Sequence, residues 1–136
     1  MSQVTRQKRI ILATGSRRVD DFAGAYQQIF SWLEFEAHLF GRKEVLVIEG
    51  GAEGWDTVYG QAAEDLGVHR RRIDAVRDRV ELVKQLMEKY PTKPACWAHA
   101  RDWDSGTGHC ARAAREAGIP TADYGVRTDA ESKKEE

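Results

Sequence analysis

The sequence predicts a single α/β domain built on an open, mostly parallel sheet with helices on both faces. Short apolar runs alternate along the chain with segments whose apolar residues recur every three or four positions, as expected for strands alternating with amphipathic helices. Glycine-bearing turns follow several of the apolar runs. The length of 136 residues corresponds to about one domain.

The first strand and the first helix have the clearest signals. Residues 9–14 (Arg-Ile-Ile-Leu-Ala-Thr) form an apolar run without alternating polar residues, which predicts a buried strand. Asp20 or Asp21 is predicted to cap the next helix, because a short carboxylate accepts hydrogen bonds from the unpaired amides of the first turn. Apolar residues then recur at helical spacing over residues 22–40, and Gly41 ends this helix.

The rest of the chain continues the alternation. Gly67 and Pro91 are predicted helix stops, because glycine readily adopts the left-handed conformation after a helix and proline cannot continue one. The remaining strands are predicted at residues 44–49, 68–75, 95–100 and 121–124, and the remaining helices at residues 57–66, 76–90 and 107–117. We expect residues 1–8 to be an N-terminal extension, residues 9–127 the folded domain, and residues 128–136 a disordered charged tail.

Composition argues against several classes of protein. The formal net charge of −1 argues against a strongly basic nucleic-acid clamp, so a nucleic-acid partner is not expected. No run of about 18 apolar residues is present and residues 10–14 are too short for a signal-peptide core, which predicts a cytoplasmic protein without a membrane partner. Cys96 and Cys110, even with His99 and His109, match no zinc-site or disulfide spacing, so we expect neither a metal nor a structural disulfide.

Three glycine-bearing turns form the candidate binding site: residues 14–17 (Thr-Gly-Ser-Arg), 50–54 (Gly-Gly-Ala-Glu-Gly) and 105–108 (Ser-Gly-Thr-Gly). In a parallel sheet all three would lie at the carboxyl edge, where glycine permits close approach of a ligand and the first amides of a helix favour an anion. Each turn alone could be a plain strand-to-helix connection, but three on one edge favour a phosphate-bearing ligand. The strings G-x-x-x-x-G-K-[ST] and G-x-G-x-x-G are absent, which argues against a P-loop NTPase and a standard dinucleotide dehydrogenase.

These turns, with an Ala-rich helix that ends in Gly-Ile-Pro at residues 118–120, resemble the SLOG superfamily, and within it the small stand-alone YspA/YpsA-like proteins. The resemblance covers residues 9–124, and its most specific part is the string Gly-Gly-Ala-x-Gly-x-Asp of residues 50–56. It implies a Rossmann-like domain that binds a nucleotide or nucleotide-derived ligand across the three loops.

The sequence departs from the family's pattern in three places. Glu49 stands where small relatives often carry His, Trp55 replaces a usual Ala, and the segment between Gly67 and Arg77 is shorter than in the family. The pair Arg77-Asp78 is similar to an Arg-Asn pair of the family.

The resemblance leaves three functions open. Binding of a nucleotide-derived ligand, as a sensor or ligand-holding protein, ranks first. A nucleoside 5′-monophosphate phosphoribohydrolase related to the LOG enzymes ranks second, and DprA-like handling of single-stranded DNA ranks third. The LOG string P-G-G-x-G-T-x-x-E has no glutamate match in the third turn, so weak or no hydrolase activity is expected, although Glu49 or Glu53 could substitute from the neighbouring loop.

Four side chains near the turns have a functional and a structural interpretation. Arg17 could pair with a phosphate or be a solvated loop residue. Asp56 could accept hydrogen bonds from ribose hydroxyls or cap a helix, and Thr107 could bind a phosphate or act as a plain cap. Trp55 could stack on a base, or pack against a loop or a second subunit.

No catalytic residue is assigned, and no cofactor is expected apart from a nucleotide or nucleotide-derived ligand. Helical aromatic residues such as Trp32, Phe35 and Phe40 are compatible with a homo-oligomer. The predicted ligand-binding residues are Thr14, Gly15, Ser16, Arg17, Gly50, Gly51, Ala52, Gly54, Asp56, Gly106, Thr107 and Gly108.

Overall fold

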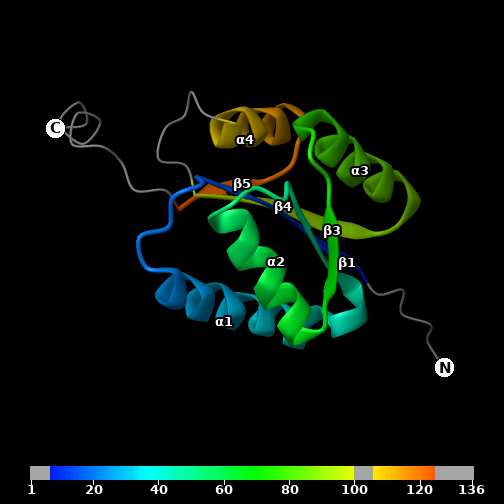
Figure 1. Ribbon diagram of the computed structural model, residues 1–136. Coiled ribbons are helices and arrows are strands. Elements are labelled where there is room, and N and C mark those ends of the chain that lie inside the picture. The colour runs from blue at the N-terminus through cyan, green and yellow to red at the C-terminus, as the bar shows by residue number, and fades with distance from the viewer. Residues whose placement is uncertain (1–6, 100–105, 125–136) are drawn as a thin grey trace, which may run out of the picture.

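A five-stranded sheet, parallel throughout, is the centre of the computed structural model, which describes residues 7–99 and 106–124 (Figure 1). The strands are β1 (Lys8–Gly15), β2 (Val45–Glu49), β3 (His69–Arg72), β4 (Thr92–His99) and β5 (Thr121–Asp123). The helices are α1 (Phe22–Phe40), α2 (Trp55–Leu66), α3 (Val76–Lys89) and α4 (Gly106–Glu116), with a short 3₁₀ helix η1 (Arg42–Glu44). The predicted α/β fold class is confirmed.

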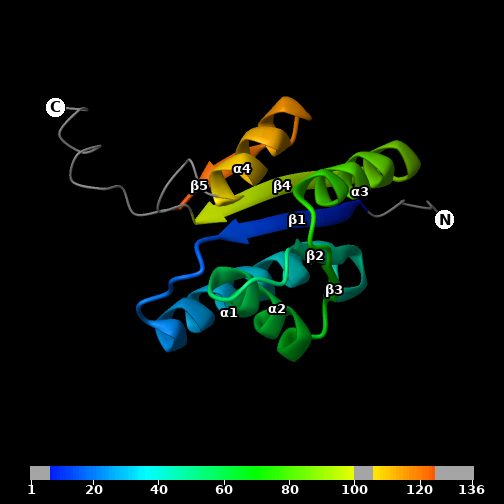
Figure 2. The same ribbon diagram turned by 45° about the horizontal axis from the view of Figure 1, so that its top comes forward.

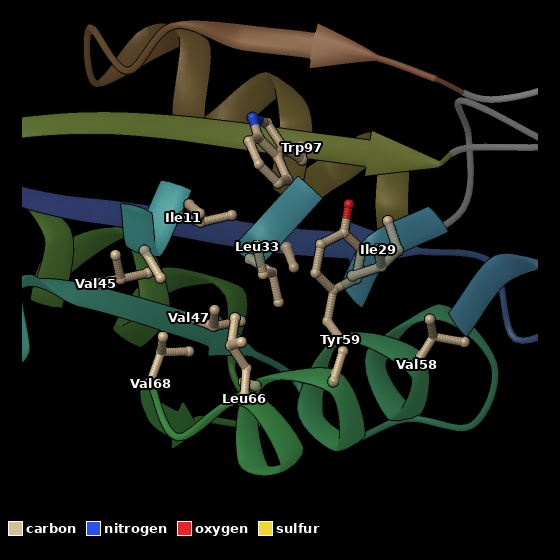
Figure 3. Packing of buried hydrophobic residues seen from close by; sticks show 14 of the residues in the cluster. Ile11, Ile29, Leu33, Val45, Val47, Val58, Tyr59, Leu66, Val68 and Trp97 are labelled. Carbon is tan, nitrogen blue, oxygen red and sulfur yellow. The ribbon is translucent and has the colours of Figure 1, made fainter. Parts of the chain in front are cut away.

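The helices cover both faces of the sheet, with α1 and α2 on one face and α3 and α4 on the other (Figure 2). Alternate residues of β1 point into the two layers: Ile11 and Ala13 pack in the core beneath α1 and α2, and Ile10 and Leu12 in the core beneath α3 and α4. Tyr59 of α2 lies among the residues of the first core (Figure 3). Strands β1, β2 and the second half of β4 are buried on both faces, so their apolar runs need no polar alternation.

The strand order is β3-β2-β1-β4-β5, so the direction in which successive strands are added to the sheet reverses between β1 and β4. The chain proceeds outward from β1 to β2 and β3, and α3 then returns it to β4 on the other side of β1. The connections after β1 and β4 lead to helices on opposite faces (Figure 2). Open α/β sheets bind their ligands at the carboxyl ends of the strands on either side of such a reversal.

The element boundaries differ from the prediction by two or more residues in three elements. Strand β3 ends at Arg72, three residues before its predicted end. Strand β4 begins at Thr92, three residues before the predicted start, and so includes Pro94; β5 pairs with β4 only from Cys96 onward. Pro94 therefore lies where one side of β4 has no neighbouring strand, a position that tolerates the missing N–H. Helix α2 begins at Trp55, two residues before its predicted start.

Local signals at the helix ends behave as expected. Asp21, and not Asp20, caps α1: its Oδ1 accepts a hydrogen bond of 3.0 Å from the N–H of Gly24. Gly67 ends α2 in the left-handed conformation, with φ at 81°.

No helix in the described part of the chain is long and apolar enough to cross a bilayer. The predicted tail, residues 128–136, and Trp103 lie outside the described residues.

Candidate functional site at the carboxyl edge of the sheet

The three glycine-bearing turns converge on one groove of about 600 Å³ at the carboxyl edge, which we call the carboxyl-edge groove. It lies at the reversal point between β1 and β4 and extends towards β2 and β3. The residues that line it are Thr14, Gly15, Ser16, Arg17, Gly50, Gly51, Ala52, Asp56, Asp74, Val76, Arg79, Gly106 and Thr107. Ten of the twelve predicted ligand-binding residues are therefore brought together.

The two predicted residues that do not line the groove have structural roles in the described structure. Gly54 adopts a φ of 83°, and a side chain there would collide with the backbone of Arg17. The N–H of Trp55 donates to the carbonyl of Ser16 at 3.2 Å, so the first and second turns are joined directly. Gly108 is buried within α4.

Carboxylates inside the protein occupy the amides of the second turn. Oδ2 of Asp56 accepts hydrogen bonds of 3.2 Å from the N–H groups of both Gly50 and Ala52. Oε2 of Glu49 accepts one of 3.2 Å from the N–H of Gly51. Asp56 thus closes the loop that precedes α2, whereas the N-cap position of the helix is occupied by Gly54. The backbone of this turn is shaped by internal anions and does not present three free donors to a phosphate.

Asp56 and Arg79 both line the groove and are largely buried, with exposed fractions of 4% and 7%. They meet at Gly50, where a Cβ atom would lie 2.8 Å from Nη1 of Arg79 and 3.0 Å from Oδ2 of Asp56. Nη2 of Arg79 donates to the carbonyl of Asp74 at 3.2 Å. Burial raises the pKa of Asp56, and the N–H of Ala52, the charge of Arg79 and the N–H of Gly50 oppose that rise.

Glu49 is fully buried beneath the second turn and does not line the groove. Its Oε1 lies 3.7 Å from Nη2 of Arg70, which also pairs with Glu64 of α2. Burial raises the pKa of Glu49, and the Arg70 charge counteracts this. Glu53 is exposed and is also absent from the lining. Neither glutamate lines the groove.

The opposite end of the groove combines polar groups of the first turn and of α4. Thr14 and Thr107 are buried, while Arg17 is exposed at the rim. Gly106 and Thr107 begin α4, and the first N–H groups of a helix have no partner within it. This end, with the positive end of a helix dipole and a guanidinium, favours an anion.

Trp55 packs within the protein and continues into a group of aromatic rings. It lies against Gly15, where any side chain would collide with it, and it stacks on His99 at 3.8 Å between ring centroids. The hydroxyl of Tyr59 is hydrogen-bonded to Nε2 of His99 at 2.6 Å. Desolvation by burial lowers the pKa of His99 to about 4. The loop-packing interpretation of Trp55 thus describes its contacts.

Cys96 and Cys110 are both buried as free thiols in the core beneath α3 and α4. Their mutual hydrogen bond and burial raise the pKa of Cys96. Among the described residues, no cluster of three His, Cys, Asp or Glu side chains is arranged to hold a metal ion.

Asp74, Val76 and Arg79 also line the groove and were not predicted from the sequence. Arg79 had a usable signal, since it follows Val76 by three positions and precedes Val83 by four, on the apolar stripe of its helix. A charged residue on a buried helix face needs a partner, and this one faces the groove. Arg77, the residue similar to the family's arginine, points to solvent, with a side chain that is 93% exposed.

The fold and groove define a single-domain α/β protein with a Rossmann-like arrangement and a polar groove at the reversal point of the strand order. Comparisons with protein-family models, with curated proteins and with solved structures found no match to this chain. Membership of the SLOG superfamily stays a prediction that rests on the three turns.

Proposed function

We propose that this protein binds a phosphate-bearing nucleotide, or a ligand derived from one, in the carboxyl-edge groove, and that it acts as a sensor or ligand-holding protein. The observation that carries the proposal is the convergence of three glycine-bearing turns on one groove at the strand-order reversal. The groove volume of about 600 Å³ lies in the range of small-molecule sites, about 300–1,000 Å³.

The distribution of polar groups supports a phosphate position at one end of the groove. The second turn is filled by the carboxylates of Asp56 and Glu49, which would repel an anion. The start of α4 and Arg17 offer a helix N-terminus and a guanidinium instead. We therefore propose that the phosphate binds beside Thr107 and Arg17, with the remainder of the ligand extending towards Asp56.

Two neighbouring arginines provide a matched test. Arg17 lines the groove, whereas Arg18 is exposed, does not line it and pairs with Asp20 at 3.2 Å. In calorimetric titrations with AMP, Arg17→Ala should weaken binding about tenfold because it removes a charged phosphate contact. Arg18→Ala should bind like the wild type. If no nucleoside monophosphate, dinucleotide or ribose 5-phosphate binds the wild type, the proposal is wrong.

Phosphoribohydrolase activity is the second candidate, and Asp56 is the observation that favours it. A buried carboxylate with a raised pKa, facing a ligand groove, is suited to general acid–base chemistry. Incubation with nucleoside monophosphates, followed by chromatography for free base, tests this activity. Turnover that disappears in Asp56→Asn would make the protein an enzyme, whereas binding without release of base would support the ligand-holding role.

A further inference from the structure

Two buried polar atoms in the floor of the carboxyl-edge groove lack a hydrogen-bond partner: Oδ1 of Asp56 and Nε of Arg79. Their side chains are more than nine-tenths buried, and both line the groove. Leaving a buried donor or acceptor unpaired costs about 1–3 kcal/mol, and more for charged groups. A fold that keeps one of each at the wall of a groove is suited to a ligand group that satisfies both.

The two atoms set opposite requirements for a ligand. Nε of Arg79 can only donate a hydrogen bond, and an ionised Asp56 can only accept one. A fully ionised phosphate could accept from Arg79 but would face the Asp56 carboxylate. A cation would face the guanidinium. A hydroxyl group has the chemistry to meet both requirements, because it accepts from one partner and donates to the other.

The surrounding contacts hold the pair in this orientation. Oδ2 of Asp56 is held by the N–H groups of Gly50 and Ala52, and Nη2 of Arg79 by the carbonyl of Asp74. No hydrogen bond or ion pair within the described residues joins Asp56 directly to Arg79. The unpaired atoms are therefore those left over after the protein's own contacts are made.

We infer that Asp56 and Arg79 together recognise a ribose hydroxyl, so that the protein selects ribonucleotides over deoxyribonucleotides. This inference rests on the proposed function, since it assumes a nucleotide in the groove. Arg79 is then a specificity-determining residue that acts on an uncharged part of the ligand, while Arg17 contacts the phosphate. The sugar lies over the second turn, where the absence of a side chain at Gly50 lets the Arg79 guanidinium and the Asp56 carboxylate approach the backbone closely.

The test compares AMP with its 2′-deoxy and 3′-deoxy analogues by calorimetric titration of the wild-type protein. We expect at least one analogue to bind about tenfold or more weakly than AMP, because losing the hydroxyl leaves buried charged groups unpaired. If AMP binds and both analogues bind within about twofold of it, the inference is wrong while the proposed function stands. If no nucleotide binds, both fail.

A change of base separates sugar recognition from base recognition. UMP and CMP keep the ribose of AMP, so they should show the same penalty when the hydroxyl is removed. If affinity depends on the base and not on the sugar hydroxyl, the pair reads a base edge and the inference is overturned.

Protein variants assign the discrimination to the pair. In Asp56→Asn, the amide oxygen can keep accepting from Gly50 and Ala52, and the NH₂ group replaces the free acceptor. The ratio of AMP to deoxy-AMP affinity should fall towards one, a result that a purely structural role of Asp56 would not produce. Asp78→Asn, at an exposed position that does not line the groove, should keep the wild-type ratio.

Arg79→Lys should also reduce the ratio, because lysine has no Nε–H at that position and cannot reproduce the guanidinium's geometry. Arg77→Lys is its matched control on the same helix, at an exposed position. Should Arg79→Lys fail to fold, the wild-type comparison with the deoxy analogues still decides the inference. An unchanged ratio in both folded variants would overturn the assignment to this pair.

Discussion

Protonation of His99 should destabilise the folded protein in mild acid. The ring is 3% exposed, stacks on Trp55 and is hydrogen-bonded to Tyr59, and its pKa is lowered from 6.5 to about 4 by burial. Between these values the unfolded chain binds a proton that the folded chain does not. The free energy of unfolding therefore falls as the pH decreases from about 6.5 towards 4.

The expected size of this change in stability follows from the two pKa values of His99. A group that titrates at 6.5 when unfolded and at about 4 when folded lowers the free energy of unfolding by about 2 kcal/mol between pH 7 and pH 5. Glu49 and Asp56 act in the opposite direction, because a raised carboxyl pKa makes the folded state bind protons more readily than the unfolded chain. The effect of His99 must therefore be measured as a difference between proteins.

Urea unfolding followed by tryptophan fluorescence, at pH 7 and pH 5, gives this difference. Wild type should lose about 2 kcal/mol more stability than His99→Gln over this interval, whatever the absolute stability of the variant. His38→Gln and His69→Gln, at exposed positions, should follow the wild type. Equal pH dependence of wild type and His99→Gln would refute the reasoning that His99 is buried in its neutral form.

Three further outcomes test the structure. Gly51→Ala should lower the free energy of unfolding by about 1–2 kcal/mol, because φ is +78° there. Gly106→Ala should lower the free energy of unfolding by less in the same urea measurement, because a Cβ added there would meet open space. Asp21→Ala should cost about 1 kcal/mol through loss of the α1 cap, measured in the same way. Cys96 and Cys110 should resist a thiol reagent in the native protein and react fully in urea; rapid native reaction would contradict their burial.

The sequence predicted the parts of the fold that depend on local patterns. The apolar runs that become β1 and β2, and the helical periodicity of α1, identify buried elements without knowledge of their neighbours. The positions of the glycine turns after the strands, combined with a parallel sheet, were enough to bring most of the groove residues together.

The remaining parts depend on contacts between distant segments. The strand order, with β4 beside β1, is set by packing of helices across both faces and has no local signature. The extension of β4 to Thr92 follows from its pairing with Lys8 of β1, which the polar residues and Pro94 conceal. Only the local contacts of Asp56 could be predicted from the sequence. Its partners Gly50 and Ala52 lie in the same loop, whereas Arg79 belongs to α3 and is brought near only by the fold.

Strand β3 also affects how copies of this protein can associate. It forms one edge of the sheet, and an open edge can act as a template for pairing with another chain. Its four residues are His69, Arg70, Arg71 and Arg72, and the arginine side chains at positions 70 and 72 make ion pairs within the chain. Two such edges brought together would align arginines against arginines. Like-charge repulsion thus disfavours strand-to-strand pairing of two copies at this edge.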